Sequence, residues 1–374
     1  MASYEALGAS PVINASGRMT ALGGSVLAPE VREAMSRAAE AYVDMDDLLR
    51  QAGARIAALC GAEDAFLTTG AAAGVVAMVA AVVAGDDPAR VRALPDATWP
   101  RRDIVVQAGH LVDFGAPIEQ MVRLGGGRVR AVGAVNAVPR SALEAALDGE
   151  AAAVLYVQSH HAVGRGQLPL EEVVASAHAA GVPVLVDAAA EEDLTRYVRL
   201  GADLVAYSGG KAIGGPSSGF VLGRRHLVAL CRAHEHGILR PMKIGKETAL
   251  ALVAATERYL LRDDAAEHLA WEERLEGLRA GLSGVDGLRL AVEADEAGRA
   301  IRRLAVGVEP GAGFTLAQLV ERLRRASPPI AVRSHRLAEG WIALDPRPLR
   351  PSEVDVVVGR IRAEVAYLRG ATAP

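Results

Sequence analysis

The sequence predicts an α/β fold, in which a doubly wound, mostly parallel sheet is followed by a smaller C-terminal α+β domain. Two observations support this prediction. Short runs that are apolar almost throughout alternate with amphipathic stretches over most of the first 250 residues, a pattern typical of strands covered by helices on both faces. Hydrophobic residues also make up 51% of the 374 residues, which is enough for a sizeable core.

Seven apolar runs are expected to form the large sheet. They are Ala65–Thr68, Ile104–Gln107, Val129–Val132, Val154–Gln158, Pro183–Val186, Leu204–Tyr207 and Gly219–Leu222. Helical patterns lie between them, over Ala71–Ala84, Pro117–Leu124, Arg140–Leu147, Leu170–Ala180 and Glu191–Leu200. Glycine or proline marks several of the junctions, as helix and strand ends commonly require.

The pattern changes after residue 245, where residues 246–282 become continuously helical. The elements expected beyond are strands Leu288–Val292 and Arg303–Val308, a helix over Thr315–Arg325, a strand pair Ile330–Arg333 and Trp341–Leu344, and a last helix over Ser352–Leu368. We therefore expect an N-terminal arm (1–45), a large domain (46–245), a connecting helix (246–282) and a small domain (283–374).

Charge, cysteine content and hydropathy exclude several classes of function. The net charge of −4 gives no overall basic field that would gather nucleic acid or an anionic membrane. Cys60 and Cys231 are too few for a disulfide framework. The first thirty residues show no signal-peptide pattern, and the longest apolar run, 71–85, is shorter than the roughly 18 residues of a membrane span. A cytoplasmic protein is expected.

Lysine is rare in this chain. Lys211, Lys243 and Lys246 are the only lysines among 41 basic residues, so arginine supplies nearly all the positive charge. Each lysine is therefore a candidate for chemistry that a guanidinium cannot perform, such as forming an imine, although some can persist by chance.

Polar residues follow several of the predicted strands at their carboxyl ends, the edge where open α/β sheets bind ligands. In chain order these are Thr69-Gly70-Ala71 at the start of an apolar helix, His110, then His160 and His161, then Asp187, and finally Ser208 and Lys211. Their gathering at one edge is the observation that points to a ligand site.

Each of these residues has a use in holding pyridoxal 5′-phosphate. The helix start after Thr69 would hold a phosphate, helped by Ser208, and a buried Asp187 would pair with a protonated pyridine nitrogen. Lys211 would form a Schiff base with the aldehyde, and the His110 imidazole would lie flat on the ring. Taken singly, each has an ordinary structural explanation, as a helix cap, a turn residue, a buried histidine or a surface lysine. The combination favours the cofactor.

Motifs in the same order along the chain give a resemblance. They are Ile13-Asn14-Ala15-Ser16-Gly17, Leu22-Gly23-Gly24, Thr68-Thr69-Gly70, Gly109-His110 with Asp113-Phe114-Gly115-Ala116-Pro117, Ser208-Gly209-Gly210-Lys211 with Gly214-Gly215-Pro216, and Lys243-Ile244-Gly245-Lys246-Glu247. With them the chain resembles the fold-type-I pyridoxal-phosphate enzymes of the selenocysteine synthase-like group, and within that group the D-glucosaminate-6-phosphate ammonia-lyases. The resemblance covers nearly the whole chain.

The resemblance implies roles for individual residues. Lys211 would carry the cofactor, Asp187 would pair with the pyridine nitrogen and His110 would stack on the ring. The phosphate would be held by Thr69, Gly70, Ala71 and Ser208. The implied reaction is α,β-elimination of a 2-amino sugar acid such as D-glucosaminate 6-phosphate to a 2-keto-3-deoxy acid and ammonia, in a homodimer or a larger even-numbered oligomer.

One motif departs from the selenocysteine synthases, because Ala52-Gly53-Ala54-Arg55 stands where they carry Arg-Gly-x-Arg. Together with the acidic balance of charge, this argues against tRNA as a partner and for a small-molecule substrate.

The substrate needs cations to bind it. Arg333 is our first choice for a carboxylate, with Arg18 and Arg347 as alternatives, because guanidinium binds carboxylate on two atoms. A distal phosphate would meet Lys243 and Lys246 together with Arg240, unless these form a surface cluster or a subunit contact. His160 and His161 would relay a proton or serve as loop residues. No metal site is expected, since His234 and His236 lack acidic partners at ligand spacing.

Two alternatives stay open from the residues alone. One keeps the cofactor and changes the outcome to racemisation, aldol cleavage or β-substitution at an amino-acid Cα. The other is a non-catalytic binding protein that has the fold, which the full set of Lys211, Asp187 and His110 argues against.

Overall fold

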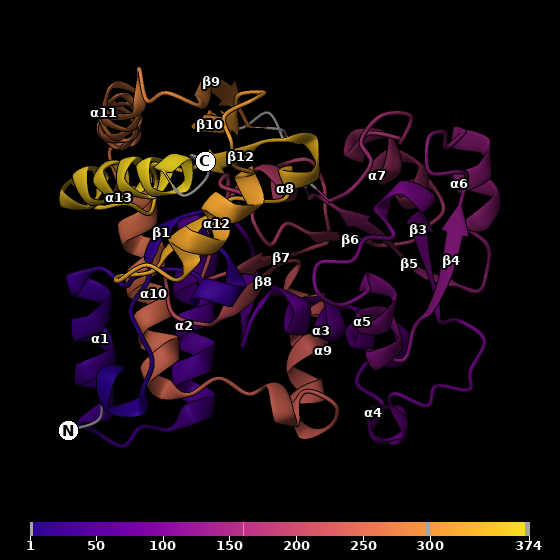
Figure 1. The fold of residues 1–374 in the computed structure, drawn as a ribbon. Helices are drawn as coiled ribbons and strands as arrows, with labels where there is room; N and C mark the ends of the chain where they lie inside the picture. Colours follow the sequence, from indigo (N-terminus) through magenta and orange to yellow (C-terminus); the bar gives the residue numbers. More distant parts are fainter. Residues whose placement is uncertain (1–2, 160, 296–299, 371–374) are drawn as a thin grey trace. The chain divides into compact units, whose positions relative to one another are not determined.

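The computed structural model describes residues 3–159, 161–295 and 300–370 (Figure 1). Its contacts divide the chain into two compact units. The large unit is Gly23–Leu261, and the small unit joins Met1–Leu22 to Arg262–Pro374. The four-part division expected from the sequence stays a prediction.

A seven-stranded sheet forms the centre of the large unit, in the order β2-β8-β7-β6-β5-β3-β4 (Figure 1). The strands from β7 to β4 are parallel, and β8 runs antiparallel to both of its neighbours. Their bounds are β2 Asp64–Thr68, β3 Asp103–Gln107, β4 Arg128–Val132, β5 Ala151–Val157, β6 Val184–Asp187, β7 Leu204–Ser208 and β8 Gly219–Gly223. The predicted mostly parallel sheet is confirmed, with β5 beginning three residues earlier than expected.

Helices cover both faces of this sheet. One face packs on α1, α2, α6, α7, α8 and α10, and the other packs on α3, α5 and α9. An apolar cluster lies on each face of the sheet. Because side chains alternate along each strand, every strand contributes residues to both clusters. The helices are α1 Pro29–Ala39, α2 Met45–Cys60, α3 Ala71–Ala84, α4 Pro88–Ala93, α5 Ile118–Leu124, α6 Arg140–Ala146, α7 Leu170–Ala179, α8 Arg196–Arg199, α9 Arg225–Ala233 and α10 Lys246–Leu261, with short 3₁₀ turns η3 Ala108–His110, η4 His234–His236 and η5 Arg240–Met242.

The helix α3 lies against the middle of the sheet because its sequence permits a close approach. A Cβ added at Gly74 would lie 3.0 Å from the Ala206 Cβ and 3.2 Å from the nearest Val221 methyl. The helix is almost entirely Ala, Val and Gly, and most of its residues are buried. It therefore runs through the core with its N-terminus at the edge where the strands end.

The large unit differs from expectation in two ways. The sequence predicts none of the helices α1, α2, α4 and α9. The helix expected over Glu191–Leu200 is wrong, since only Arg196–Arg199 is helical. The Asp193 carboxylate accepts hydrogen bonds from the N–H groups of Thr195 and Arg196 and from the Thr195 hydroxyl, and these local bonds replace a helical turn.

The small unit contains two sheets and three long helices packed around its own core. An antiparallel sheet has the order β12-β10-β9, and a separate parallel pair joins β1 to β11. The bounds are β1 Ile13–Ala15, β9 Leu288–Ala294, β10 Arg302–Val308, β11 Ile330–Val332, β12 Ile342–Leu344, α11 Asp264–Leu282, α12 Leu316–Arg324 and α13 Pro351–Gly370, with 3₁₀ turns η1 Glu5–Leu7, η2 Thr20–Leu22 and η6 Leu337–Glu339.

Two expectations for this part of the chain are wrong. The helix expected over residues 246–282 is two helices, because Asp263 interrupts it and caps α11 by accepting from the N–H groups of Ala265 and Ala266. The expected pairing of Ile330–Arg333 with Trp341–Leu344 is reduced to a single bridge between Arg333 and Ala343. The strand β11 instead pairs with β1, from the N-terminal segment.

Among the described residues, no helix is both long and apolar enough to cross a bilayer.

Candidate active site

The carboxyl ends of β2, β3, β5, β6 and β7 lie at one edge of the large sheet, since these strands run in the same direction. Thr69, His110, Asp187 and Ser208 are therefore brought to this edge, as the sequence predicts, and Ser159 follows β5 there. The parallel topology places them together although they are spread over 140 residues of sequence.

The N-terminus of α3 has features that would suit an anion. No side chain caps the helix, and its first turn contains no acidic residue. The Thr68 hydroxyl bonds the Gly70 carbonyl, and a Cβ on Gly219 would come within 2.7 Å of the Gly70 carbonyl carbon. The first N–H groups of the helix have no acceptor within it, so an anion bound there would gain hydrogen bonds and the positive end of the helix dipole.

Asp187 ends β6 as a buried carboxyl group beside this helix start. Alternation along the strand places it on the same face as Leu185, the face that α3 covers. Burial raises the pKa of Asp187 to about 6, although an N–H bond from Ala189 (3.1 Å) and the charge of Lys211 both lower it. A carboxylate held in this way is stabilised by a cationic N–H partner.

His110 is a buried, neutral histidine. The N–H of Val157 donates to its Nδ1 at 3.2 Å, so the proton of the neutral ring belongs on Nε2. Burial lowers the pKa of His110 to about 4. The ring stands edge-on to Tyr156, with centroids 4.5 Å apart and planes at 86°. This packing fixes the orientation of an uncharged imidazole, which can lie against a cationic ring without repulsion.

Lys211 lies on a glycine-rich loop that is fixed by backbone hydrogen bonds. Gly209 donates to Ser218, and Gly215 donates to Gly209 at 2.7 Å. The Ser25 hydroxyl donates to the carbonyls of Gly210 (3.0 Å) and Lys211 (3.2 Å) from a distant part of the sequence. The backbone that carries the lysine is therefore held from both sides.

Gly24 provides a test of this support. We expect Gly24→Ala to displace the lysine loop, because a Cβ at this position would lie 2.5 Å from the Gly210 carbonyl oxygen. The variant should lose 1–3 kcal/mol of unfolding free energy, about what overpacking costs, and should bind cofactor more weakly. Gly23→Ala is the matched control, since Gly23 also has a positive φ but its Cβ would meet nothing within 4 Å. Equal effects in thermal unfolding and cofactor titration would refute the role of the close contact.

The groups at this edge fit pyridoxal 5′-phosphate. The uncapped start of α3 suits a phosphate, and the buried carboxyl of Asp187 suits a protonated ring nitrogen. A lysine on a fixed loop suits an aldehyde, and a neutral, buried imidazole suits an aromatic ring. Ser208 is half-buried at the end of β7, whereas Thr69 is exposed beside the helix start.

Some predicted substrate residues have other contacts in the large unit. Lys246 donates to the Ala38 carbonyl at the end of α1 and lies 2.8 Å from the Glu247 carboxylate, so it ties α10 to α1. Lys243 and Arg240 are exposed. His161 is exposed on the loop after β5, and His160 falls outside the described residues.

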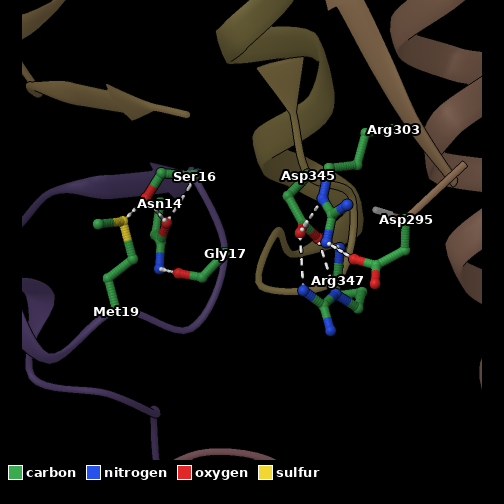
Figure 2. Close-up of polar contacts among 8 residues, drawn as sticks. All are labelled: Asn14, Ser16, Gly17, Met19, Asp295, Arg303, Asp345 and Arg347. Carbon is green, nitrogen blue, oxygen red and sulfur yellow. Dashed lines mark hydrogen bonds and ion pairs between the residues drawn. The ribbon is translucent and has the colours of Figure 1, made fainter. Parts of the chain in front are cut away.

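In the small unit, Arg347 belongs to a buried network of charges (Figure 2). Its guanidinium holds Asp345 on two atoms, at 3.0 and 2.8 Å, and Arg303 bonds the same carboxylate at 2.9 Å while also bonding Asp295. Burial alone would raise the pKa of Asp345, but Arg347 and Arg303 outweigh it and lower the pKa to about 2. A Cβ on Gly17 would lie 3.1 Å from this carboxylate.

The three arginines proposed for the substrate carboxylate, Arg18, Arg333 and Arg347, are all half-buried as whole residues. The Arg347 side chain is 7% exposed within this network. Sequence reasoning proposed Arg347 without its partners. An Asp two residues before an Arg is a weak signal that the two side chains pair. Asp345 and Arg303 are 42 residues apart, so the sequence gives little sign of their ion pair.

Comparisons with known proteins identify the class. The chain has the fold of the fold-type-I pyridoxal-phosphate enzymes, as shown by a ureidoglycine-glyoxylate aminotransferase from Bacillus subtilis with a TM-score of 0.61 at 15% identity, covering 97% of this chain and 95% of that one. Residues 12–276 match the SelA family, described as L-seryl-tRNA selenium transferase. The chain belongs to this family.

Two relatives match over nearly their full length. A D-glucosaminate-6-phosphate ammonia lyase from Salmonella typhimurium is 43% identical over 360 residues, 96% of each chain. A 5′-C-glycyluridine monooxygenase-decarboxylase from a Streptomyces species is 46% identical over 364 residues, 96% of this chain and 90% of that one. The solved structure of a D-glucosaminate-6-phosphate ammonia-lyase matches with a TM-score of 0.90 at 41% identity, covering 98% of both chains.

Proposed function

We propose that this protein is a pyridoxal-phosphate-dependent ammonia-lyase that acts on a 2-amino sugar acid such as D-glucosaminate 6-phosphate. The overall reaction removes the α-proton and the β-hydroxyl, and water then replaces the amine as ammonia leaves, giving a 2-keto-3-deoxy acid. The observation that carries the proposal is the match to the solved ammonia-lyase over 98% of both chains.

The cofactor contributes one effect when bound, which is to withdraw electrons from the substrate Cα and make its proton acidic. The remaining steps belong to this chain. The Lys211 Nζ would hold the cofactor and, once displaced by the substrate amine, take the Cα proton. Asp187 would keep the ring nitrogen protonated, and His110 would stack on the ring. The first turn of α3, with Thr69, Gly70, Ala71 and Ser208, would hold the cofactor phosphate.

We further propose how the substrate is held. Arg333 stays our first choice for the substrate carboxylate, because guanidinium binds carboxylate on two atoms. Arg18 and Arg347 stay as alternatives, and Arg347 already donates two of its N–H groups to Asp345. Lys243 and Arg240, which are exposed, suit a distal phosphate better than Lys246, which is held by Ala38 and Glu247. His160 and His161 stay as candidates for proton relay to the leaving hydroxyl.

The homologous monooxygenase-decarboxylase makes a second function specific enough to test. Its identity to this chain is 46%, slightly above the 43% of the ammonia lyase, and its name describes oxygenation and loss of CO2 from a glycyl nucleoside. Such a reaction consumes O2 and does not require a β-hydroxyl, so the two candidates predict different products.

The deciding experiment incubates the cofactor-loaded protein with D-glucosaminate 6-phosphate under air and under nitrogen. The lyase proposal predicts ammonia and 2-keto acid in equal amounts, at the same rate in both atmospheres. Turnover of a glycyl nucleoside that needs O2 and releases CO2, with no reaction on the amino sugar acid, would overturn it. Cofactor binding without turnover of either substrate would favour a non-catalytic protein.

We also propose that the protein is a homodimer or a larger even-numbered oligomer in the cytoplasm. Both cysteines, Cys60 and Cys231, are free and buried, which suits a reducing compartment. Large apolar side chains such as Val26 and Tyr42 are strongly exposed on the large unit, which supports a surface covered by another copy. Light scattering of the purified protein would report the oligomeric state.

A further inference from the structure

The segment between β6 and α8 is held by three tyrosine hydroxyls from three different elements. Tyr197 in α8 donates to the Glu191 carboxylate at 2.7 Å, and Tyr207 in β7 donates to the Asp193 carbonyl at 3.1 Å. Tyr259 in α10 donates to the Glu192 carbonyl at 2.6 Å. We call Tyr197, Tyr207 and Tyr259 the tyrosine clasp. It fixes three consecutive acidic residues that form no helix.

The start of this segment contacts the candidate cofactor site directly. The Ala189 N–H donates to the Asp187 carboxylate at 3.1 Å, and the Ala189 carbonyl accepts from the N–H of Ser208 at 3.3 Å. The Ala188 N–H donates to Ala206 on the neighbouring strand. One short stretch of backbone therefore touches both the proposed partner of the ring nitrogen and a proposed phosphate ligand.

All three clasp tyrosines are shielded from solvent, and burial keeps at least two of their hydroxyls protonated. All three rings are buried, and Tyr197 and Tyr207 pack near each other with centroids 6.5 Å apart. Burial raises the pKa of Tyr197, helped by the adjacent Glu191 carboxylate, and burial also raises the pKa of Tyr207. Their hydroxyls therefore stay protonated and continue to donate.

We propose that the tyrosine clasp is a positioning device for Asp187, which sets how firmly this carboxylate holds the ring nitrogen of the cofactor. The proposal rests on the proposed cofactor site and assigns the three tyrosines no contact with substrate or cofactor. Removing one hydroxyl would let the acidic segment shift and would weaken the Ala189 hydrogen bond that partly offsets the burial of the Asp187 carboxylate.

Tyr259→Phe tests the proposal, because it removes one hydroxyl and keeps the ring. We expect the dissociation constant of pyridoxal 5′-phosphate to rise about fivefold, the loss of one hydrogen bond to a buried group. We expect kcat to fall several-fold while KM changes less than twofold, since the substrate ligands are untouched. The pH midpoint of the bound cofactor's absorbance should rise, because a less protonated ring nitrogen withdraws fewer electrons from the carbon that Lys211 attacks.

A second variant and a control keep the test decisive. Tyr197→Phe should shift the same three quantities in the same direction, and it supplies the result if Tyr259→Phe does not fold. Tyr367→Phe, an exposed tyrosine on α13, should leave all three unchanged. Folded clasp variants that match wild type in cofactor affinity and absorbance midpoint would overturn the proposal. A wild-type protein that binds no cofactor would instead overturn the proposed function, so the two failures are distinct.

Discussion

Replacing Lys211 with alanine is expected to lower kcat/KM for ammonia release at least 1,000-fold. The variant loses the amine that holds the cofactor and the base that would take the Cα proton, and a positioned base alone contributes about 10²–10⁴-fold. The carbonyls of Gly210 and Lys211 keep their bonds to the Ser25 hydroxyl, because these bonds involve only the backbone of the loop. The fold should therefore survive the substitution.

The chemical role is separated from a structural one by amine rescue. A small primary amine added to Lys211→Ala should restore part of the rate, because it can replace the missing base, and it should restore nothing in a variant whose loop is displaced. Borohydride reduction of the wild-type protein followed by peptide mapping should place the cofactor on Lys211. An adduct on Lys243 or Lys246 would show that the site is assigned to the wrong lysine. Arg37→Ala, which removes an exposed cation from α1, is the control and should keep full activity.

The sequence predicts the sheet edge well because parallel strands leave a strong pattern. Runs such as Ile104–Gln107 and Leu204–Tyr207 are buried on both faces and are therefore apolar almost throughout. In such folds ligand groups follow the strand ends. The positions of His110, Asp187 and Ser208 follow from this rule without any knowledge of packing. Because the chain has only three lysines, the sequence also narrows the choice of the residue that binds the cofactor aldehyde.

The hydrogen bonds that support the site cannot be predicted from the pattern of apolar runs. Ser25 contacts the lysine loop across 185 residues, and Tyr259 reaches Glu192 across 67 residues. Such bonds depend on how distant elements pack, and one serine or tyrosine in a sequence carries no mark of its partner. The helix predicted over Glu191–Leu200 is wrong for the same reason. The Asp193 carboxylate accepts from the N–H of Arg196. The hydroxyls of two tyrosines outside the acidic run donate to the Glu191 carboxylate and the Asp193 carbonyl.

Asp187→Asn is expected to stabilise the cofactor-free protein and to inactivate the loaded enzyme. In the folded protein, burial raises the pKa of Asp187 from 3.8 to about 6, so the folded state holds a proton that the unfolded state has released. Stability due to this group is therefore present below pH 4 and is lost as the pH rises to about 6, by about 2 to 3 kcal/mol. The neutral amide avoids this loss and can still accept the Ala189 N–H.

The two measurements have opposite signs, which makes the prediction specific. At pH 7.5 the cofactor-free Asp187→Asn protein should unfold at a higher temperature than wild type, and its stability should lack the decline between pH 4 and 6. The loaded variant should show kcat at least 100-fold lower, because an amide cannot hold the ring nitrogen protonated as a carboxylate does. Glu119→Gln, an exposed acid on α5, should show neither effect. A variant less stable than wild type at pH 7.5 would contradict the prediction, because it would mean that groups of the protein itself stabilise the negative charge of Asp187. In the proposed site, the cationic ring of the cofactor stabilises this charge.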